Sequence, residues 1–250
     1  MTTRRGLLAP LLRLTLLAGA RARVSPRVAR GIVAACLGLV LGGAPDVVRA
    51  CPPRFERDAA QDLAALARTG QVAIAVDRVD GAYTVDASAV LRAEPRRLFE
   101  ASVDYARYAE MGIPNLRDNR LVSVAADGQR LHTWSWLQTF GYSSKHYLAV
   151  DITRDLARPR AFGICWTLAR RQPGWPHEDA PAFHRLDGSW YVEPLGAPPA
   201  GEVVYVRYSA VASPDPAIPE ALVAWAIRRQ LTEGTRGLIQ ALAREAARRP

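Results

Sequence analysis

The chain has 250 residues, 49% of them hydrophobic and 23% charged, a composition typical of a globular protein with room for one domain and an extension. Its formal net charge of +9 is unevenly placed. Residues 1–50 contain 8 of the 33 basic and 1 of the 24 acidic residues, which leaves 25 basic and 23 acidic residues in 51–250. A body so close to neutral lacks the basic surface that nucleic-acid binding requires, so we expect no nucleic-acid partner.

Residues 1–50 have the pattern of a targeting segment. Four arginines between residues 21 and 30 precede an apolar run of 14 residues, 31–44, and Val48 and Ala50 are small residues at the positions that a signal peptidase reads. The run is shorter than the roughly 20 residues of a transmembrane helix. We therefore predict a secreted or periplasmic protein that is cleaved after Ala50. A leader that is retained as a membrane anchor is the alternative.

Two of the three cysteines would remain after such a cut, because Cys36 lies within the leader. In an oxidising compartment Cys51 and Cys165 are candidates for a disulfide. The alternative is that Cys165 is a small buried side chain in its strand. Cys51 would also be the first mature residue, as in a lipoprotein, although Arg49 is unusual two positions before a lipidated cysteine.

The first elements after the leader alternate between helix and strand. Apolar residues at helical spacing predict a lead-in helix at 54–68, within a segment 51–70 that ends at Gly70. A strand at 71–79, a turn at Asp80-Gly81 and a returning strand at 82–92 form a hairpin. Pro95 then begins a second helix.

From residue 120 to residue 212 the apolar residues recur with a period of two, which indicates strands. Together with the first hairpin they make about eight strands, and a proline-rich loop at 170–182 interrupts them. The predicted strands are 121–125, 130–140, 146–153, 160–169, 183–193 and 202–212.

The last element is a helix of roughly 29 residues that begins after Pro219, about 44 Å long at ~1.5 Å per residue. Gly234 and Gly237 interrupt it at a cost of about 1 kcal/mol each relative to alanine, which suggests close packing or a bend there. A helix of this length needs a long apolar groove, and a twisted antiparallel sheet can supply one, so the fold class is α+β. Its apolar stripe comprises Leu222, Val223, Ala226, Ile227, Leu231, Leu238, Ala241 and Leu242.

Three stretches resemble a known superfamily: VDASAVLRAEPRRLFEASVDYARYAEMGIP at 85–114, GSWYVEPL at 188–195 and VVYVRYSAVASPDPAIPEALV at 203–223. In order and spacing they are similar to the START-like superfamily, also called SRPBCC or helix-grip, and to its bacterial polyketide cyclase/dehydrase and coenzyme Q-binding-like branch. The resemblance implies a ligand-binding domain over 71–250, in which a curved antiparallel sheet wraps around the long C-terminal helix. It also implies an apolar tunnel for a lipid, sterol, quinone or polyketide-like molecule.

Aromatic and aliphatic side chains share single faces of several predicted strands, and facing inward they would line such a tunnel. The alternative is that they fill a solid core. The residues that we expect to bind ligand are Trp134, Trp136, Leu148, Trp166, Trp190, Tyr208, Leu222, Ala226 and Ile227.

Catalytic chemistry has no comparable signal. The four histidines lack metal-ligand spacing, and no nucleophile, phosphate-loop or dinucleotide motif is present, so we predict no catalytic residue, metal or cofactor. His132 and His146 would meet across a hairpin and orient a polar ligand group, unless each has only a structural role.

The leading hypothesis is an exported carrier of a hydrophobic small molecule. Transient contact with a membrane is compatible with this role. The alternatives are an aromatase/cyclase-type enzyme acting on a polyketide-like substrate and an envelope scaffold protein without a small ligand. The sequence gives no oligomeric state.

Overall fold

The computed structural model describes residues 55–249 except 140–141, 154–159, 197–202 and 216–219, and within these it leaves out the side chains of Thr139, Tyr142 and residues 220–227. The chain divides into two units, Met1–Arg49 and Ala50–Pro250, and all described residues belong to the second.

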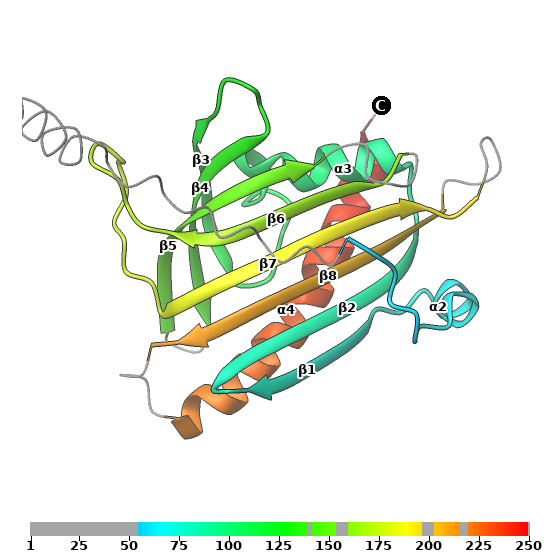
Figure 1. The fold of residues 1–250 in the computed structure, drawn as a ribbon, viewed down its shortest axis with the longest axis horizontal. Helices are drawn as coiled ribbons and strands as arrows, with labels where there is room; N and C mark the ends of the chain where they lie inside the picture. The colour runs from blue at the N-terminus through cyan, green and yellow to red at the C-terminus, as the bar shows by residue number, and fades with distance from the viewer. Residues whose placement is uncertain (1–54, 140–141, 154–159, 197–202, 216–219, 250) are drawn as a thin grey trace, which may run out of the picture. The chain divides into compact units, whose positions relative to one another are not determined.

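Eight strands form one antiparallel sheet in the order β1-β2-β8-β7-β6-β5-β4-β3 (Figure 1). Strands β3 to β8 neighbour one another in chain order, and β2 joins the sheet by pairing with β8. The eight strands that were predicted are therefore confirmed, with ends shifted by a few residues. They are β1 (Ala73–Val79), β2 (Ala82–Arg92), β3 (Leu116–Val124), β4 (Arg130–Thr139), β5 (Tyr142–Thr153), β6 (Phe162–Ala169), β7 (Phe183–Pro194) and β8 (Val203–Pro214).

The long helix α4 (Glu220–Arg248) lies across the concave face of this sheet, where it contacts β1, β2 and the helix α3 (Pro95–Val103) (Figure 1). A 3-10 turn, η1 (Tyr105–Arg107), follows α3 and leads to β3. The curved sheet around a C-terminal helix is the α+β helix-grip arrangement that the sequence predicted.

The lead-in helix is shorter than predicted. Helix α2 (Leu63–Thr69) begins nine residues after the expected start, because the side chain of Asp62 caps it by accepting a hydrogen bond from the Ala65 amide at 2.9 Å. The described residues before it, 55–62, form no helix and pack on the convex face of the sheet. There the ring of Phe55 lies against Gly163, which has no room for a Cβ.

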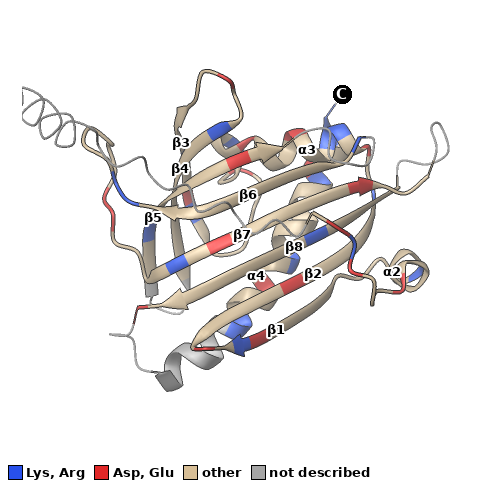
Figure 2. Cartoon of the chain, viewed as in Figure 1, with Lys and Arg blue, Asp and Glu red and all other residues tan. Residues whose placement is uncertain are grey.

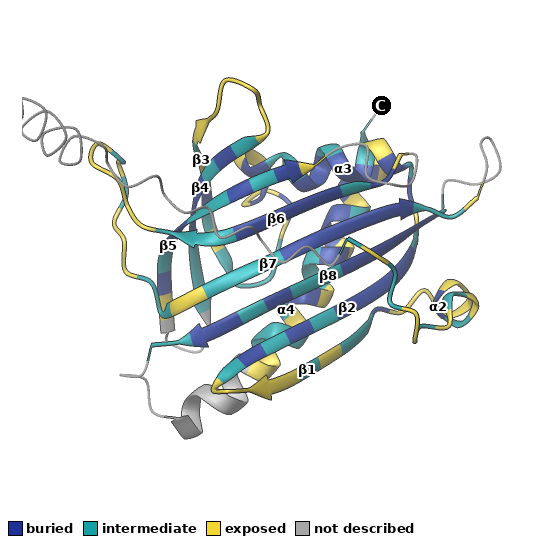
Figure 3. Ribbon diagram, in the orientation of Figure 1, coloured by how far each residue is buried: buried dark blue, intermediate teal, exposed yellow. Residues whose placement is uncertain are grey.

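Apolar residues of the concave face form the main core with α3 and α4. Buried and less buried positions alternate along the first half of β2, whereas residues 87–90 of β2 and 204–207 of β8 are buried on both faces (Figure 3). Phe99 of α3 stacks on Phe162 of β6 with ring centroids 4.5 Å apart. Helix α4 contributes Ile239 and Leu242, each 1% exposed.

The convex face holds buried charges that are paired. Glu193, with a side chain only 5% exposed, accepts hydrogen bonds from Arg57 at 2.6 and 2.7 Å and from the Tyr191 hydroxyl at 2.9 Å. Arg207 binds Asp86 at 2.7 and 3.0 Å. Figure 2 shows basic and acidic residues interspersed along the strands. The residues that precede α2 therefore hold the outer surface of the sheet by ion pairs as well as by apolar contact.

Cys165 lies on this same convex face and is disulfide-bonded. Cys51 lies outside the described residues, so the predicted pairing with it stays a prediction.

Candidate ligand cavity

A cavity of about 200 Å³ opens between the concave face of the sheet, the η1 region and α4. Its walls are mostly aromatic and aliphatic, and none of the described residues that line it is charged. The apolar lining residues are Ile113, Pro114, Leu116, Leu137, Leu148, Trp166, Phe183, Leu186, Trp190, Ala212, Leu231, Gly234 and Leu238.

Three aromatic rings form one wall. The ring centroid of Tyr208 lies 5.4 Å from that of Trp166 and 5.1 Å from that of Trp190. Gly188, opposite Trp166 in the β6–β7 pairing, leaves room for the Trp166 indole where any Cβ would collide with it. The absence of a side chain at Gly188 therefore allows the Trp166 indole to lie in the cavity wall.

Two tyrosines from the η1 region also line the cavity. Tyr105 and Tyr108 have ring centroids 4.8 Å apart, and the Tyr108 hydroxyl donates to the Ser102 carbonyl at 2.6 Å. Burial raises the pKa of Tyr105, Tyr108 and Tyr208, so all three phenols are neutral. They offer hydroxyl groups but no negative charge.

The polar part of the lining is a row that crosses three strands. Asn119 of β3 is paired with Ser135 of β4, and Ser135 is paired with His146 of β5, so the three side chains stand side by side on the concave face. Asn119 Nδ2 donates to Ser135 Oγ at 2.7 Å. Thr235 and Gln230 supply further polar atoms from α4.

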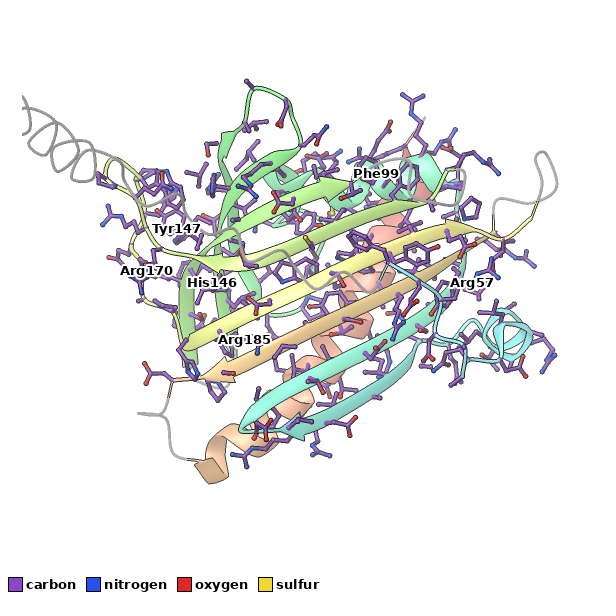
Figure 4. The ribbon with its side chains drawn as sticks, viewed as in Figure 1. Arg57, Phe99, His146, Tyr147, Arg170 and Arg185 are labelled. Atoms are coloured by element: carbon purple, nitrogen blue, oxygen red, sulfur yellow. The ribbon has the colours of Figure 1, made fainter. Side chains whose placement is uncertain are left out.

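His146 is the only lining residue described whose ordinary pKa lies near neutrality. It is 1% exposed, and burial lowers its pKa to about 4, so the imidazole is neutral at physiological pH. Its Nδ1 lies 3.0 Å from the Ser144 hydroxyl, which accepts the Ala182 amide at 3.1 Å. Figure 4 labels His146 and its neighbour Tyr147, whose side chains leave β5 on opposite faces.

Four of the predicted ligand residues line the cavity: Leu148, Trp166, Trp190 and Tyr208. That they bind a ligand stays a prediction. The side chains of Leu222, Ala226 and Ile227 lie outside the described part of α4.

Trp134 and Trp136 lie on the convex face of β4, so the expectation that this row points inward is wrong. Trp134 stacks on His177 at 4.4 Å and donates its indole N–H to the Glu178 carbonyl at 2.8 Å. Trp136 donates to Ser143 Oγ at 2.9 Å. The concave face of β4 instead carries Ser135 and Leu137, a row too weakly apolar to stand out in the sequence.

The expected meeting of His132 and His146 is also wrong. His132 pairs in register with Ala149 and lies on the convex face, where its ring is 5.1 Å from that of Trp175, whereas His146 faces the cavity. The two histidines lie on neighbouring strands, β4 and β5, but the alternation of side chains along a strand puts them on opposite faces of the sheet.

The loop at 170–182 packs against the convex face and contributes no residue to the cavity described above. Its His177 is fixed by two hydrogen bonds with the Tyr147 hydroxyl, both 3.0 Å long, and Lys145 pairs with Glu178. The sequence did not reveal the lining residues Tyr105, Tyr108, Asn119 and Ser135, since they lie in short or irregular segments or on a polar face. Gly234, which was predicted to mark close packing or a bend, borders the cavity instead.

The described residues contain no group of three or more His, Cys, Asp or Glu side chains placed to hold a metal ion. None of their helices is long and apolar enough to cross a membrane.

Comparison with known proteins gives a likeness in structure alone. No protein-family model matches the chain, and no curated protein matches its sequence. It is similar to the STAR-related lipid transfer protein of Xanthomonas axonopodis (TM-score 0.54, 14% identity, 75% of this chain and 96% of that one). It is also similar to human STARD10 (0.52, 10%, 75% and 80%) and to the Zhui aromatase/cyclase of a Streptomyces strain (0.51, 17%, 67% and 95%). The chain thus has a START-like, or SRPBCC, fold.

Proposed function

Starting from this START-like fold, we propose that the protein binds a hydrophobic small molecule in the cavity between the sheet and α4 and acts as a carrier. The observation that supports it most directly is the cavity itself, about 200 Å³ of space lined by aromatic and aliphatic side chains with a few neutral polar groups. Ligand sites usually have this composition, whereas a solid core has no such space.

Apolar burial supplies the driving force. A ligand that buries about 300 Å² of apolar surface gains up to ~7 kcal/mol at ~25 cal/mol per Å² before the costs of association. The lack of a charged side chain among the lining residues described favours an uncharged ligand, because a buried ion would lose its hydration without a partner.

The similar structures support this proposal at the level of fold. Two are described as lipid transfer or STARD proteins and one as an aromatase/cyclase. A carrier is favoured over the enzyme because burial lowers the pKa of the one histidine in the described lining and raises the pKa of the three lining tyrosines, which makes them a weak base and weak acids near neutrality. The scaffold alternative predicts a filled interior, which the cavity disfavours.

We further propose that the protein is exported and that its leader is removed after Ala50. The support is the basic, apolar and small-residue pattern of residues 1–50.

Binding is tested with N-phenyl-1-naphthylamine, an uncharged probe whose fluorescence rises in apolar surroundings. We expect saturable 1:1 binding to the purified full chain. Leu148→Trp, which places an indole in the cavity, should weaken it at least tenfold. The same change at the exposed Leu121, outside the cavity, is the matched control and should leave binding intact.

Native mass spectrometry of protein isolated from its source adds a second measurement and should show a co-bound mass of small-molecule size. If the wild type shows neither saturable probe binding nor a co-bound mass, ligand binding is refuted.

A further inference from the structure

Two lining residues of the polar row have a side-chain atom without a hydrogen-bond partner among the described residues: Asn119, through its buried Oδ1, and His146. The only hydrogen bond that the side chain of His146 makes with a described residue joins Nδ1 and the Ser144 hydroxyl. The Nε2 of His146 has no partner among the described residues. The side chain as a whole is only 1% exposed.

The hydrogen bonds of Ser144 determine which nitrogen of His146 carries the proton. Ser144 is buried, and its Oγ accepts the Ala182 amide at 3.1 Å. If Nδ1 also donated to this oxygen, the hydroxyl hydrogen would have no acceptor among the described residues. If the hydroxyl donates to Nδ1, Ser144 and Nδ1 are both satisfied, and Nε2–H is the one group of the pair left for the cavity. The satisfied arrangement places the proton on Nε2.

The Ala182 amide that sets this polarity is itself held by backbone pairing. Two residues before it, Ala180 exchanges both backbone hydrogen bonds with Lys145, at 2.8 and 3.0 Å. The end of the loop is thereby attached to β5 one residue away from Ser144. The end of the loop, at Ala182, thus fixes the tautomer of His146 through Ser144. In histidines the hydrogen bond at one ring nitrogen usually sets the protonation of the other.

We propose that the ligand of this cavity carries an uncharged carbonyl oxygen that accepts a hydrogen bond from Nε2–H of His146. The inference rests on the proposed binding function and specifies its ligand class. A carbonyl oxygen accepts a hydrogen bond without bringing a charge into the cavity. A carboxylate would bring a charge for which the lining residues described provide no cation.

The test compares four probes on one naphthalene skeleton. They are 2-acetylnaphthalene, 2-isopropenylnaphthalene (in which a CH2 replaces the ketone oxygen), 1-(2-naphthyl)ethanol and 2-naphthoate, each titrated by calorimetry against the full chain. We expect the ketone to bind about tenfold more tightly than the isopropenyl isostere, since a buried hydrogen bond is typically worth about that factor. The naphthoate should bind most weakly.

His146→Leu should remove the preference for the ketone and leave the binding of the isostere within about twofold, because leucine fills a similar space without a donor. His184→Leu is the matched control, since His184 is exposed and does not line the cavity, and it should keep the preference. Ser144→Ala frees Nδ1 and should reduce the preference only in part.

Several outcomes separate this inference from the function on which it rests. Equal binding of ketone and isostere, or of ketone and alcohol, by the wild type overturns the carbonyl assignment while binding itself stands. Binding of none of the neutral probes overturns the proposed function with it. Independently of any variant, long-range 1H–15N NMR of the wild-type imidazole should show the proton on Nε2, and a proton on Nδ1 would refute the inference.

Discussion

The imidazole of His146 has lost the water that would solvate its charged form, and this loss lowers its pKa to about 4. The unfolded chain takes up this proton at about pH 6.5. Between these two values the unfolded state binds more protons than the folded state. Protonation of His146 therefore does not change the free energy of unfolding above neutrality, and it lowers that free energy as the pH falls from about 6.5 to about 4.

This difference predicts a pH-dependent loss of stability. Between about pH 7 and about pH 4.5 the wild type should lose about 2–3 kcal/mol more than His146→Leu in urea unfolding. His184→Leu, changed at an exposed histidine, should follow the wild type. Parallel losses in the wild type and His146→Leu would show that the folded protein binds the proton as readily as the unfolded chain.

Residue identity alone did not reveal this role. His132 and His146 look alike in sequence, each within an alternating apolar segment, yet only His146 lines the cavity. The lowered pKa depends on burial that no local pattern reports.

At the scale of elements, helix α4 contains two glycines in different surroundings. A Cβ on Gly234 would meet no atom within 4 Å, because the residue borders the cavity. A Cβ on Gly237 would collide with the ring of Pro114. Close packing, one of the two reasons predicted for these glycines, therefore applies to Gly237.

The two positions give opposite predictions for the same substitution. Gly234→Ala should stabilise the protein by up to about 1 kcal/mol, because alanine restricts the unfolded chain and suits a helix interior. Gly237→Ala should destabilise it by about 1–3 kcal/mol through overpacking against Pro114. Thermal and urea unfolding without ligand measure both. A destabilised Gly234→Ala or an unaffected Gly237→Ala would contradict the packing described.

Strands and turns were the elements that the sequence predicted well. The turn at Asp80-Gly81 has positive φ angles of 50° and 79°, as an Asp-Gly hairpin requires, and β2 has the predicted bounds. The face of β4 was predicted wrongly because both of its faces have side chains that can be buried. The loop at 170–182 covers the convex face, where Trp134 lies, and Ser135 and Leu137 on the concave face line the cavity.

At the scale of the whole molecule, the described residues just before α2 belong to the domain and not to the predicted leader. Phe55 and Arg57 contact the convex face, and Glu193 would be buried without its cation if they were removed. A leader that is cleaved must therefore end before Phe55, and the predicted cut after Ala50 meets this condition.

The export proposal gives a prediction about the mature chain. Protein from the periplasmic or secreted fraction of its source should begin at Cys51, as N-terminal sequencing or intact mass would show, and should contain no free thiol, since Cys51 and Cys165 would then be the remaining cysteines. A chain that keeps its leader in the membrane fraction would support the anchor instead. A start beyond Arg57, or two free thiols, would contradict the proposal.

By itself the sequence determined the local elements, because helical and strand periodicity, turn glycines and the proline before the last helix are properties of neighbouring residues. It also indicated the START-like arrangement and four of the residues that line the cavity. Only the tertiary structure decided which face of each strand is concave, and which distant residues share it. Asn119, Ser135 and His146 meet through pairing register between strands, and a register is set by the whole sheet. The polar row of the cavity and its neutral histidine follow from that pairing.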